Sequence, residues 1–191
     1  MNTILTVTLF TTIWCVVHSL LIDAWKGKRW ARLLYNVVAG LTIVALLVWV
    51  RTMDATAIWH WHGPWQLLRG ALLVGGLIIT KLGADAHDNG EFLGLRQLRH
   101  TQPTPAPLQL SRQGILNHIR HPWYTAGLLI LPTWPTTMTD VNLAWRGVFI
   151  AYLIIGSWVE DRRLVSKFGS EYQQYRREVP GLIPRWPHSG N

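Results

Sequence analysis

The sequence contains few charged residues and a single cysteine, and both shortages restrict what the protein can be. Only 15% of its 191 residues are Asp, Glu, Lys or Arg, against about a quarter in an ordinary soluble domain. The one cysteine, Cys15, excludes an intramolecular disulfide and gives no indication of a redox centre. Acidic residues are scarcer than basic ones, ten against 18. The positions of the basic residues along the chain therefore indicate what the surplus positive charge serves.

Apolar residues make up 49% of the chain and are gathered in long continuous runs. A helix needs about 20 mostly apolar residues to cross a bilayer. Continuous runs favour helices over the alternating strands of a membrane barrel, so no strand is expected. The sequence therefore predicts an all-α polytopic membrane protein, a single domain over residues 1–191, with about five transmembrane helices at 3–22, 33–50, 67–84, 123–138 and 143–159.

The positive charges are distributed unevenly between these helices. Fifteen of the 18 Lys and Arg residues lie in the first loop, the third loop and the C-terminal tail, and only Arg51, Arg69 and Arg146 fall on the other side. Cytoplasmic loops carry an excess of Lys and Arg. We therefore expect an integral membrane protein, of the inner membrane in a bacterium, with its N-terminus outside and its C-terminus cytoplasmic. This distribution favours a lipid bilayer over nucleic acid as the partner of the net charge of +8.

The segment after the fifth predicted helix, Glu160–Glu178, has the pattern of an amphipathic cytoplasmic helix. Leu164, Phe168, Tyr172 and Tyr175 recur at helical spacing and form one face. That face is expected to pack back on the membrane-embedded body of the protein.

Two polar segments are expected to meet at the cytoplasmic ends of the fourth and fifth helices. Arg120-His121-Pro122 opens the fourth helix, and Glu160-Asp161 ends the fifth. Pro122 suits a first helical turn, where the free N–H groups, together with Arg120 and His121, would form an anion site. Glu160 would supply the opposite charge beside it.

An anion site next to a carboxylate and aromatic rings suits a zwitterionic cofactor with a cationic centre. S-adenosylmethionine has these features, and Tyr124, Tyr172 or Tyr175 could face its sulfonium through cation–π attraction. A plain interfacial ion pair between Arg120 and Glu160 is the simpler alternative.

Two longer motifs surround these residues. Residues 114–127 read G-I-L-N-H-I-R-H-P-W-Y-T-A-G, and residues 160–184 contain E-D, F-G, two tyrosines and V-P-G-L-I-P. Both segments resemble motifs of the isoprenylcysteine carboxyl methyltransferase and phospholipid methyltransferase superfamily. The resemblance implies a methyltransferase that binds S-adenosylmethionine at the cytoplasmic face of the membrane and admits its acceptor from the bilayer.

The resemblance also implies roles for individual residues, by matching position. Those that would bind or orient S-adenosylmethionine, or shape a C-terminal lid over it, are Arg120, His121, Pro122, Tyr124, Gly127, Glu160, Tyr172, Tyr175 and Pro180. Arg120, Glu160 and Tyr124 are the catalytic candidates, and no metal ligand is implied. Leu116 and Asp161 depart from the family pattern, which often has Tyr and Glu at those places.

The acceptor is open between an isoprenylcysteine carboxylate and a small thiol. Residues 92–97, F-L-G-L-R-Q, and 135–139, P-T-T-M-T, are similar to segments of the methanethiol S-methyltransferase branch of this superfamily. A thiolate would need little activation beyond a nearby cation.

Two other functions compete with methyl transfer. NADPH-dependent membrane sterol and steroid reductases resemble the chain in their R-H-P-x-Y and V-P endings, although they usually carry Asn where this chain has Trp123. A non-catalytic membrane module holding haem or a metal would use His18, or the pair His60 and His62.

Overall fold

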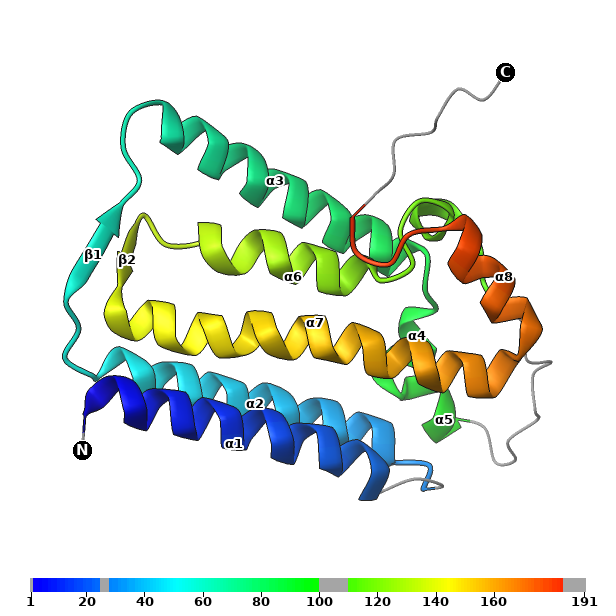
Figure 1. Ribbon diagram of the computed structural model, residues 1–191. Helices are drawn as coiled ribbons and strands as arrows, with labels where there is room; N and C mark the ends of the chain where they lie inside the picture. Colours follow the sequence, from blue (N-terminus) through cyan, green and yellow to red (C-terminus); the bar gives the residue numbers. More distant parts are fainter. Residues whose placement is uncertain (1, 25–27, 100–109, 184–191) are drawn as a thin grey trace. The chain divides into compact units, whose positions relative to one another are not determined.

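The computed structural model describes residues 2–24, 28–99 and 110–183, and its regular structure is almost entirely helical (Figure 1). The elements, in chain order, are α1 (Thr3–Ala24), α2 (Ala31–Arg51), β1 (Ala57–His60), α3 (Pro64–Asp85), α4 (Asn89–Leu93), α5 (Leu95–Arg99), the 3₁₀ helix η1 (Gly114–Asn117), α6 (Pro122–Thr133), β2 (Thr137–Thr139), α7 (Asp140–Phe168) and α8 (Ser170–Glu178). Pro184, the last residue of the C-terminal motif, lies outside the described residues.

Within the described ranges, four helices are long and apolar enough to cross a membrane, namely α1, α2, α3 and α7. They correspond to the first, second, third and fifth helices predicted from the apolar runs. Each apolar run forms a helix because only a helix satisfies every backbone N–H and C=O group within one segment in lipid. The prediction of an all-α polytopic membrane protein is confirmed.

The fourth predicted helix, over 123–138, is shorter in the structure. Helix α6 ends at Thr133, and its 12 residues rise only about 18 Å, less than the roughly 30 Å of a bilayer core. Pro135 has no N–H with which to continue the helix, and the chain becomes extended. Strand β2 then pairs antiparallel with β1, so the expectation that the chain has no strand is wrong at this short ribbon.

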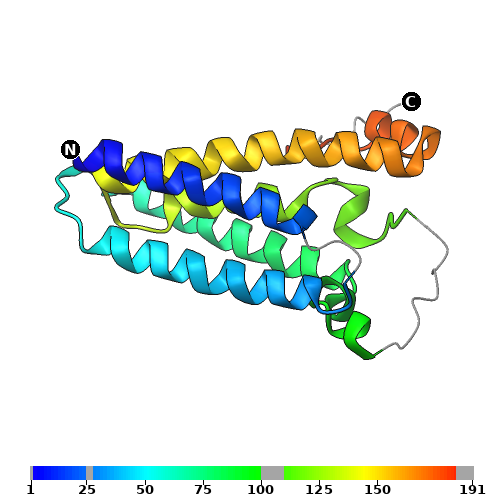
Figure 2. The ribbon, with the colours of Figure 1, turned by 90° about the horizontal axis from the view of Figure 1, so that it is seen from below.

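The chain divides into two compact units, and helix α7 contributes to both. The first unit comprises Met1–Gln66, Asp88–Thr104 and Pro135–Tyr152, and the second comprises Leu67–His87, Pro105–Trp134 and Leu153–Asn191. In the first unit, α1 and α2 lie side by side (Figures 1 and 2). All of the polar segments singled out as a candidate site belong to the second unit.

Within the second unit, α6 is held between α3 and the C-terminal half of α7 (Figure 1). A Cβ atom on Gly127 of α6 would lie 2.7 Å from Cδ1 of Leu153, and one on Gly76 of α3 would lie 2.6 Å from Cγ1 of Ile130. The absence of a side chain at both positions therefore allows the helices to approach closely.

The single helix predicted over 160–178 is in fact two helices. Gly169 separates α7 from α8 with φ of +60°, a left-handed conformation that glycine adopts with little strain. The predicted apolar face is nevertheless confirmed, because Tyr172 and Tyr175 form a buried cluster with Val179, against which Leu164 and Phe168 pack.

Candidate active site

The C-terminal residues Pro180–Leu182, called the return segment here, bind the start of α6. The backbone N–H of Arg120 donates to the carbonyl oxygen of Pro180 at 2.9 Å, and that of His121 donates to the carbonyl of Gly181 at 3.1 Å. Pro122 begins the helix, as predicted. The return segment therefore occupies the backbone N–H groups of the two residues just before α6.

The carboxylate of Asp161 lies at the centre of the polar residues in this unit. Its Oδ1 atom accepts a hydrogen bond from Nη1 of Arg120 at 2.8 Å and lies 2.8 Å from Nε2 of His121. The hydroxyl of Tyr172 donates to the same oxygen at 2.6 Å. Nε of Arg176 lies 3.5 Å from the other oxygen, Oδ2. Asp161 thus joins α7 and α8 to the start of α6.

Glu160, selected from the sequence as the acidic partner, has a looser connection to this cluster. Its carboxylate lies 3.8 Å from Nδ1 of His121, and 43% of its side chain is exposed. Asp161, the neighbour that departs from the family pattern, makes the short contacts instead. The helical pattern carried a signal for this arrangement, because Asp161 lies three residues before Leu164 and so shares the apolar face that packs inward.

Tyr124 lies on α6 one turn beyond His121, and the two rings meet edge to face with centroids 5.5 Å apart. The ring of Tyr124 also rests on α7 at Gly156, where an added Cβ atom would lie 3.0 Å from Cε1 of the tyrosine. Gly156 was not selected from the sequence. Gly127, three residues after Tyr124 on α6, was selected as a cofactor residue, and its close contact with Leu153 gives it a packing role.

Tyr175 is buried beside Tyr172, with ring centroids 5.7 Å apart. Its hydroxyl donates to the carbonyl oxygen of Leu116 in η1, and the guanidinium of Arg112 lies 4.9 Å from its ring centroid. Burial raises the pKa of Tyr175 to about 12, and burial followed by the bond to Asp161 raises the pKa of Tyr172 further. Both phenols therefore remain protonated donors at neutral pH.

Thr125, which the sequence reasoning missed, attaches the return segment to α6. Its hydroxyl oxygen lies 2.7 Å from the carbonyl oxygen of Leu182 and 3.1 Å from that of His121. Gly181 lies close against the site, since a Cβ there would be 3.2 Å from Nη2 of Arg120. Three consecutive carbonyl oxygens, those of Pro180, Gly181 and Leu182, thus accept hydrogen bonds that fix the return segment beside Arg120 and His121.

Positive charge and negative charge lie at neighbouring but different places in the site. Asp161 is one carboxylate between two guanidinium groups, those of Arg120 and Arg176, which leaves a surplus of positive charge. Nε of Arg120 is buried and has no hydrogen-bond partner within the described residues. Glu160 carries negative charge nearby and is open to solvent. This arrangement suits a ligand that presents a carboxylate and an ammonium group together.

The histidines considered as metal ligands have other partners. Nε2 of His18 lies 2.6 Å from the hydroxyl of Tyr35, and Nδ1 of His62 lies 2.9 Å from the carbonyl oxygen of His60. Across the described ranges, no three His, Cys, Asp or Glu side chains gather in a way that could hold a metal ion.

Comparison with known proteins identifies relatives over most of the chain. Methanethiol S-methyltransferase 2 of Bradyrhizobium diazoefficiens is 32% identical over 192 residues, which cover 93% of this chain and 71% of the relative. The methanethiol S-methyltransferases of Crocosphaera subtropica and Mycobacterium tuberculosis are each 26% identical, over 90% and 92% of this chain and over 71% and 75% of the relative. No family model and no solved structure matches. These relatives favour methyl transfer over the reductase alternative.

Proposed function

Because this chain belongs to the methanethiol S-methyltransferase family, we propose that it transfers a methyl group from S-adenosylmethionine to the sulfur atom of a small thiol. The protein is a membrane methyltransferase, so a methyl donor is required. The observation that carries the choice of donor is the charge arrangement around Asp161, where surplus positive charge and a separate exposed carboxylate lie within one unit.

The amino-acid portion of S-adenosylmethionine matches this arrangement. Its carboxylate would accept hydrogen bonds from Arg120, whose buried Nε atom has no partner in the described part of the chain, or from Arg176. Its ammonium group would be held by Glu160. Charge-assisted hydrogen bonds of this kind are stronger than neutral ones and fix orientation. Asp161 acts as a positioning residue because it binds Arg120 directly, and His121 supports it by binding the same carboxylate oxygen.

The aromatic residues support the cationic part of the donor. The ring of Tyr124 lies beside His121 and packs against α7 at Gly156. It therefore presents a fixed aromatic surface that attracts a sulfonium. Tyr172 is a poor candidate for this contact because it is fully buried and its hydroxyl is bound to Asp161. We therefore assign the sulfonium contact to Tyr124.

When bound, S-adenosylmethionine supplies an electrophilic methyl group, whose transfer to a thiolate breaks one carbon–sulfur bond, forms another and leaves two neutral thioethers. The protein contributes alignment and exclusion of water. The thiol proton is lost to solvent, and surplus positive charge from Arg120 and Arg176 favours the thiolate that remains.

A labelling experiment tests the proposed function. Purified protein is incubated with methyl-labelled S-adenosylmethionine and, in separate reactions, with methanethiol, a prenylated cysteine and a phospholipid amine. We expect the label in dimethyl sulfide. Transfer of the label to the prenylcysteine carboxylate, with none to the thiol, would contradict the proposal.

We also propose that the N-terminus lies outside and that the site faces the cytoplasm of the inner membrane. This orientation is supported by the distribution of basic residues, because 15 of the 18 Lys and Arg residues fall on one side of the predicted helices. Asp54→Cys, in a variant that lacks Cys15, should react with a membrane-impermeant reagent in intact cells. Ser170→Cys should react only after permeabilisation. The reverse pattern would contradict this orientation.

A further inference from the structure

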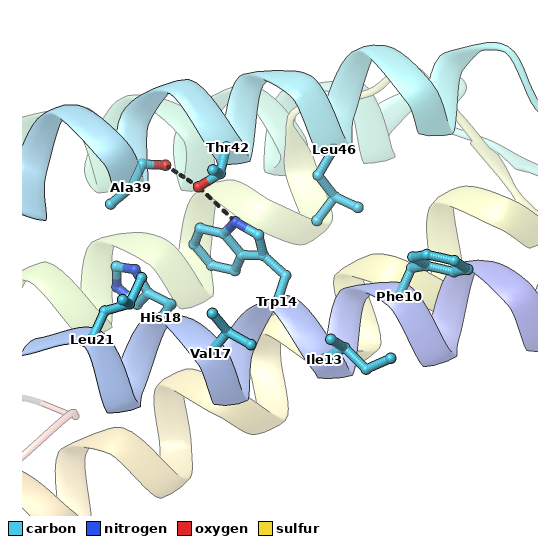
Figure 3. Close-up of a pocket in the computed structure, with 9 residues that line it drawn as sticks. All are labelled: Phe10, Ile13, Trp14, Val17, His18, Leu21, Ala39, Thr42 and Leu46. Carbon is cyan, nitrogen blue, oxygen red and sulfur yellow. Dashed lines mark hydrogen bonds between the residues drawn. The ribbon is translucent and has the colours of Figure 1, made fainter. Parts of the chain in front are cut away.

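The first unit contains an apolar groove between α1 and α2 that the proposed function does not use. Its volume is about 280 Å³, and its walls are side chains from one face of each helix, as Figure 3 shows. The lining residues are Phe10, Ile13, Trp14, Val17, His18, Leu21, Ala39, Thr42 and Leu46. Phe10, Ile13 and Val17 are each about half exposed. The groove is therefore open along one side, where two membrane-spanning helices meet lipid.

The polar side chains that line the groove already have partners. The indole Nε1 of Trp14 donates to the hydroxyl oxygen of Thr42 at 3.0 Å (Figure 3), and that hydroxyl donates to the carbonyl oxygen of Val38 at 2.7 Å. Nε2 of His18 lies 2.6 Å from the hydroxyl of Tyr35. Because these groups bind one another, the groove favours a hydrocarbon occupant over a polar one.

The groove is about as long as one leaflet of a bilayer is deep. Its α1 wall extends from Phe10 to Leu21, which is a rise of about 16 Å, and half of a bilayer core is about 15 Å thick. Most of this wall lies in the C-terminal half of α1 (Thr3–Ala24). The groove therefore lies mainly in the leaflet next to the loop that joins α1 to α2, and it has the length of an acyl chain in that leaflet.

Basic side chains lie at that end of the groove. Lys28 and Arg29 precede α2 and are exposed. Arg32, in the first turn of α2, is seven residues before Ala39 and shares its helix face, about 10 Å nearer the start of the helix. Nη1 of Arg32 donates to the backbone carbonyl oxygen of Glu91 at 2.8 Å, but the Glu91 carboxylate is 3.9 Å away and both side chains are at least half exposed. Among these described side chains, three cations and one loosely held carboxylate leave a surplus of positive charge.

We propose that the first unit binds a phospholipid with an anionic headgroup, with one acyl chain in the groove and the phosphate against Arg32, Lys28 and Arg29. Arginine forms strong charge-assisted hydrogen bonds with phosphate, and basic residues beside a membrane helix attract anionic lipids. A zwitterionic phospholipid would gain the same apolar contact, but it would bring its own cation beside these basic side chains. The inference is independent of methyl transfer, because every residue that carries it belongs to the first unit.

Two lipids that differ only in their headgroup test the choice of an anionic phospholipid. Purified protein, freed of lipid, is titrated in detergent with dioleoylphosphatidylglycerol or dioleoylphosphatidylcholine, and the melting temperature is followed, because a ligand of the folded state raises it. The half-saturating concentration should be at least about tenfold lower for the phosphatidylglycerol. Arg32→Gln should remove most of this preference, and Arg32→Lys should keep it. Arg51→Gln, at the other end of α2, is the matched control and should leave the preference unchanged.

A second pair of variants tests the acyl-chain position. Ala39→Phe fills the groove and should raise the half-saturating concentration of both lipids about tenfold, because apolar contact is lost. Leu41→Phe is the matched control, because Leu41 is on the same helix, lies outside the lining and is 68% exposed. It should change the half-saturating concentrations by less than about twofold. If Ala39→Phe does not fold, Ala39→Leu fills less volume and should give a smaller effect of the same sign.

Three outcomes would overturn the inference and leave the proposed function standing. The first is an equal half-saturating concentration for the two lipids in wild type. The second is an equal loss of preference in Arg32→Gln and Arg51→Gln. The third is an equal effect of Ala39→Phe and Leu41→Phe, which is expected if a second copy of this chain, rather than a lipid, covers the groove. If Arg32→Gln does not fold because the contact with Glu91 is lost, Lys28→Gln combined with Arg29→Gln should reduce the preference instead.

Discussion

The guanidinium of Arg120 and the carboxylate of Asp161 form a salt bridge 2.8 Å long between residues 41 positions apart in the chain. Only 9% and 10% of the two side chains are exposed. Removing one partner of a buried pair of this kind destabilises the fold strongly, because the remaining charge has lost its water and has no partner. His121 and Tyr172 bind the same carboxylate oxygen, so the cluster responds as a unit to the loss of Asp161.

A comparison of Asp161→Asn with Glu160→Gln should therefore distinguish an effect on protein stability from an effect on donor binding. Asp161→Asn leaves Arg120 buried without its counter-charge and should lower the free energy of unfolding by about 3–5 kcal/mol. Glu160→Gln removes a charge that is 43% exposed; stability should change by less than about 1 kcal/mol. Under the proposed function, Glu160→Gln should still weaken S-adenosylmethionine binding by well over tenfold (about 1.4 kcal/mol or more).

Thermal unfolding in detergent and titration calorimetry measure the two effects. Arg120→Ala should weaken donor binding at least as much as Glu160→Gln. Unchanged donor affinity in both Arg120→Ala and Glu160→Gln would mean that the donor binds elsewhere, even if the predicted stability loss in Asp161→Asn is observed.

Thr125 provides a test of the return segment. Thr125→Val keeps the shape of the side chain but removes the hydroxyl that lies 2.7 Å from the carbonyl oxygen of Leu182; it should weaken the attachment by about 1 kcal/mol. Amide hydrogen exchange at Gly181 and Leu182 should become faster, and the KM for the methyl donor should rise several-fold. Thr125→Ser keeps the hydroxyl and should restore both. Equal rates of amide hydrogen exchange in Thr125→Val and Thr125→Ser would contradict the proposal that this hydroxyl holds the return segment.

The helices and the meeting of two polar segments were predictable from the sequence, for simple reasons. In lipid, a continuous apolar segment can hydrogen-bond all of its own backbone N–H and C=O groups only as a helix. Consecutive membrane helices run in opposite directions. Residues that open one helix and close the next therefore lie at the same depth. On this ground the sequence brought Arg120 near the pair Glu160-Asp161, as the structure has them.

Other features were missed, either because residue type carries no trace of them or because the signal for them was not used. The hydrogen bonds from Arg120 and His121 to the return segment are backbone contacts, and backbone donors leave no trace in residue type. The choice between Glu160 and Asp161 depended on rotation about α7, which motif matching does not supply. The shortness of α6 followed from Pro135, but hydropathy averaged over 123–138 concealed it.

Alanine variants of Gly156 and Gly127 test whether Gly156 supports Tyr124 in a way that goes beyond ordinary helix packing. In Gly156→Ala the new Cβ atom would lie 3.0 Å from Cε1 of Tyr124, and the ring must move because it is rigid. In Gly127→Ala the neighbour is the end of the flexible Leu153 side chain, which can rotate away. Both variants should lose roughly 1–3 kcal/mol of stability. Only Gly156→Ala should also reduce kcat/KM for the donor, by about tenfold, as steady-state kinetics in detergent would reveal. A similar loss of kcat/KM in both would indicate a general packing effect.

Tyr175 gives a prediction for high pH. Burial raises the pKa of its phenol to about 12 from an ordinary value of 10.0, so the folded protein holds this proton more tightly than the unfolded chain does. The resulting stability is fully present below pH 10.0 and is lost as pH rises towards 12, because a phenolate cannot donate to the carbonyl of Leu116.

Tyr175→Phe removes both the hydrogen bond and the titration. At neutral pH the variant should be less stable than wild type by about 1–3 kcal/mol, and the difference should shrink between pH 10 and 12. Melting temperatures of the two proteins, measured side by side across this range, provide the comparison. Tyr172, whose pKa is also raised, titrates in both proteins and largely cancels in the difference. A gap that stays constant with pH would show that Tyr175 titrates alike in the folded and unfolded states, and the burial argument for its pKa would then be wrong.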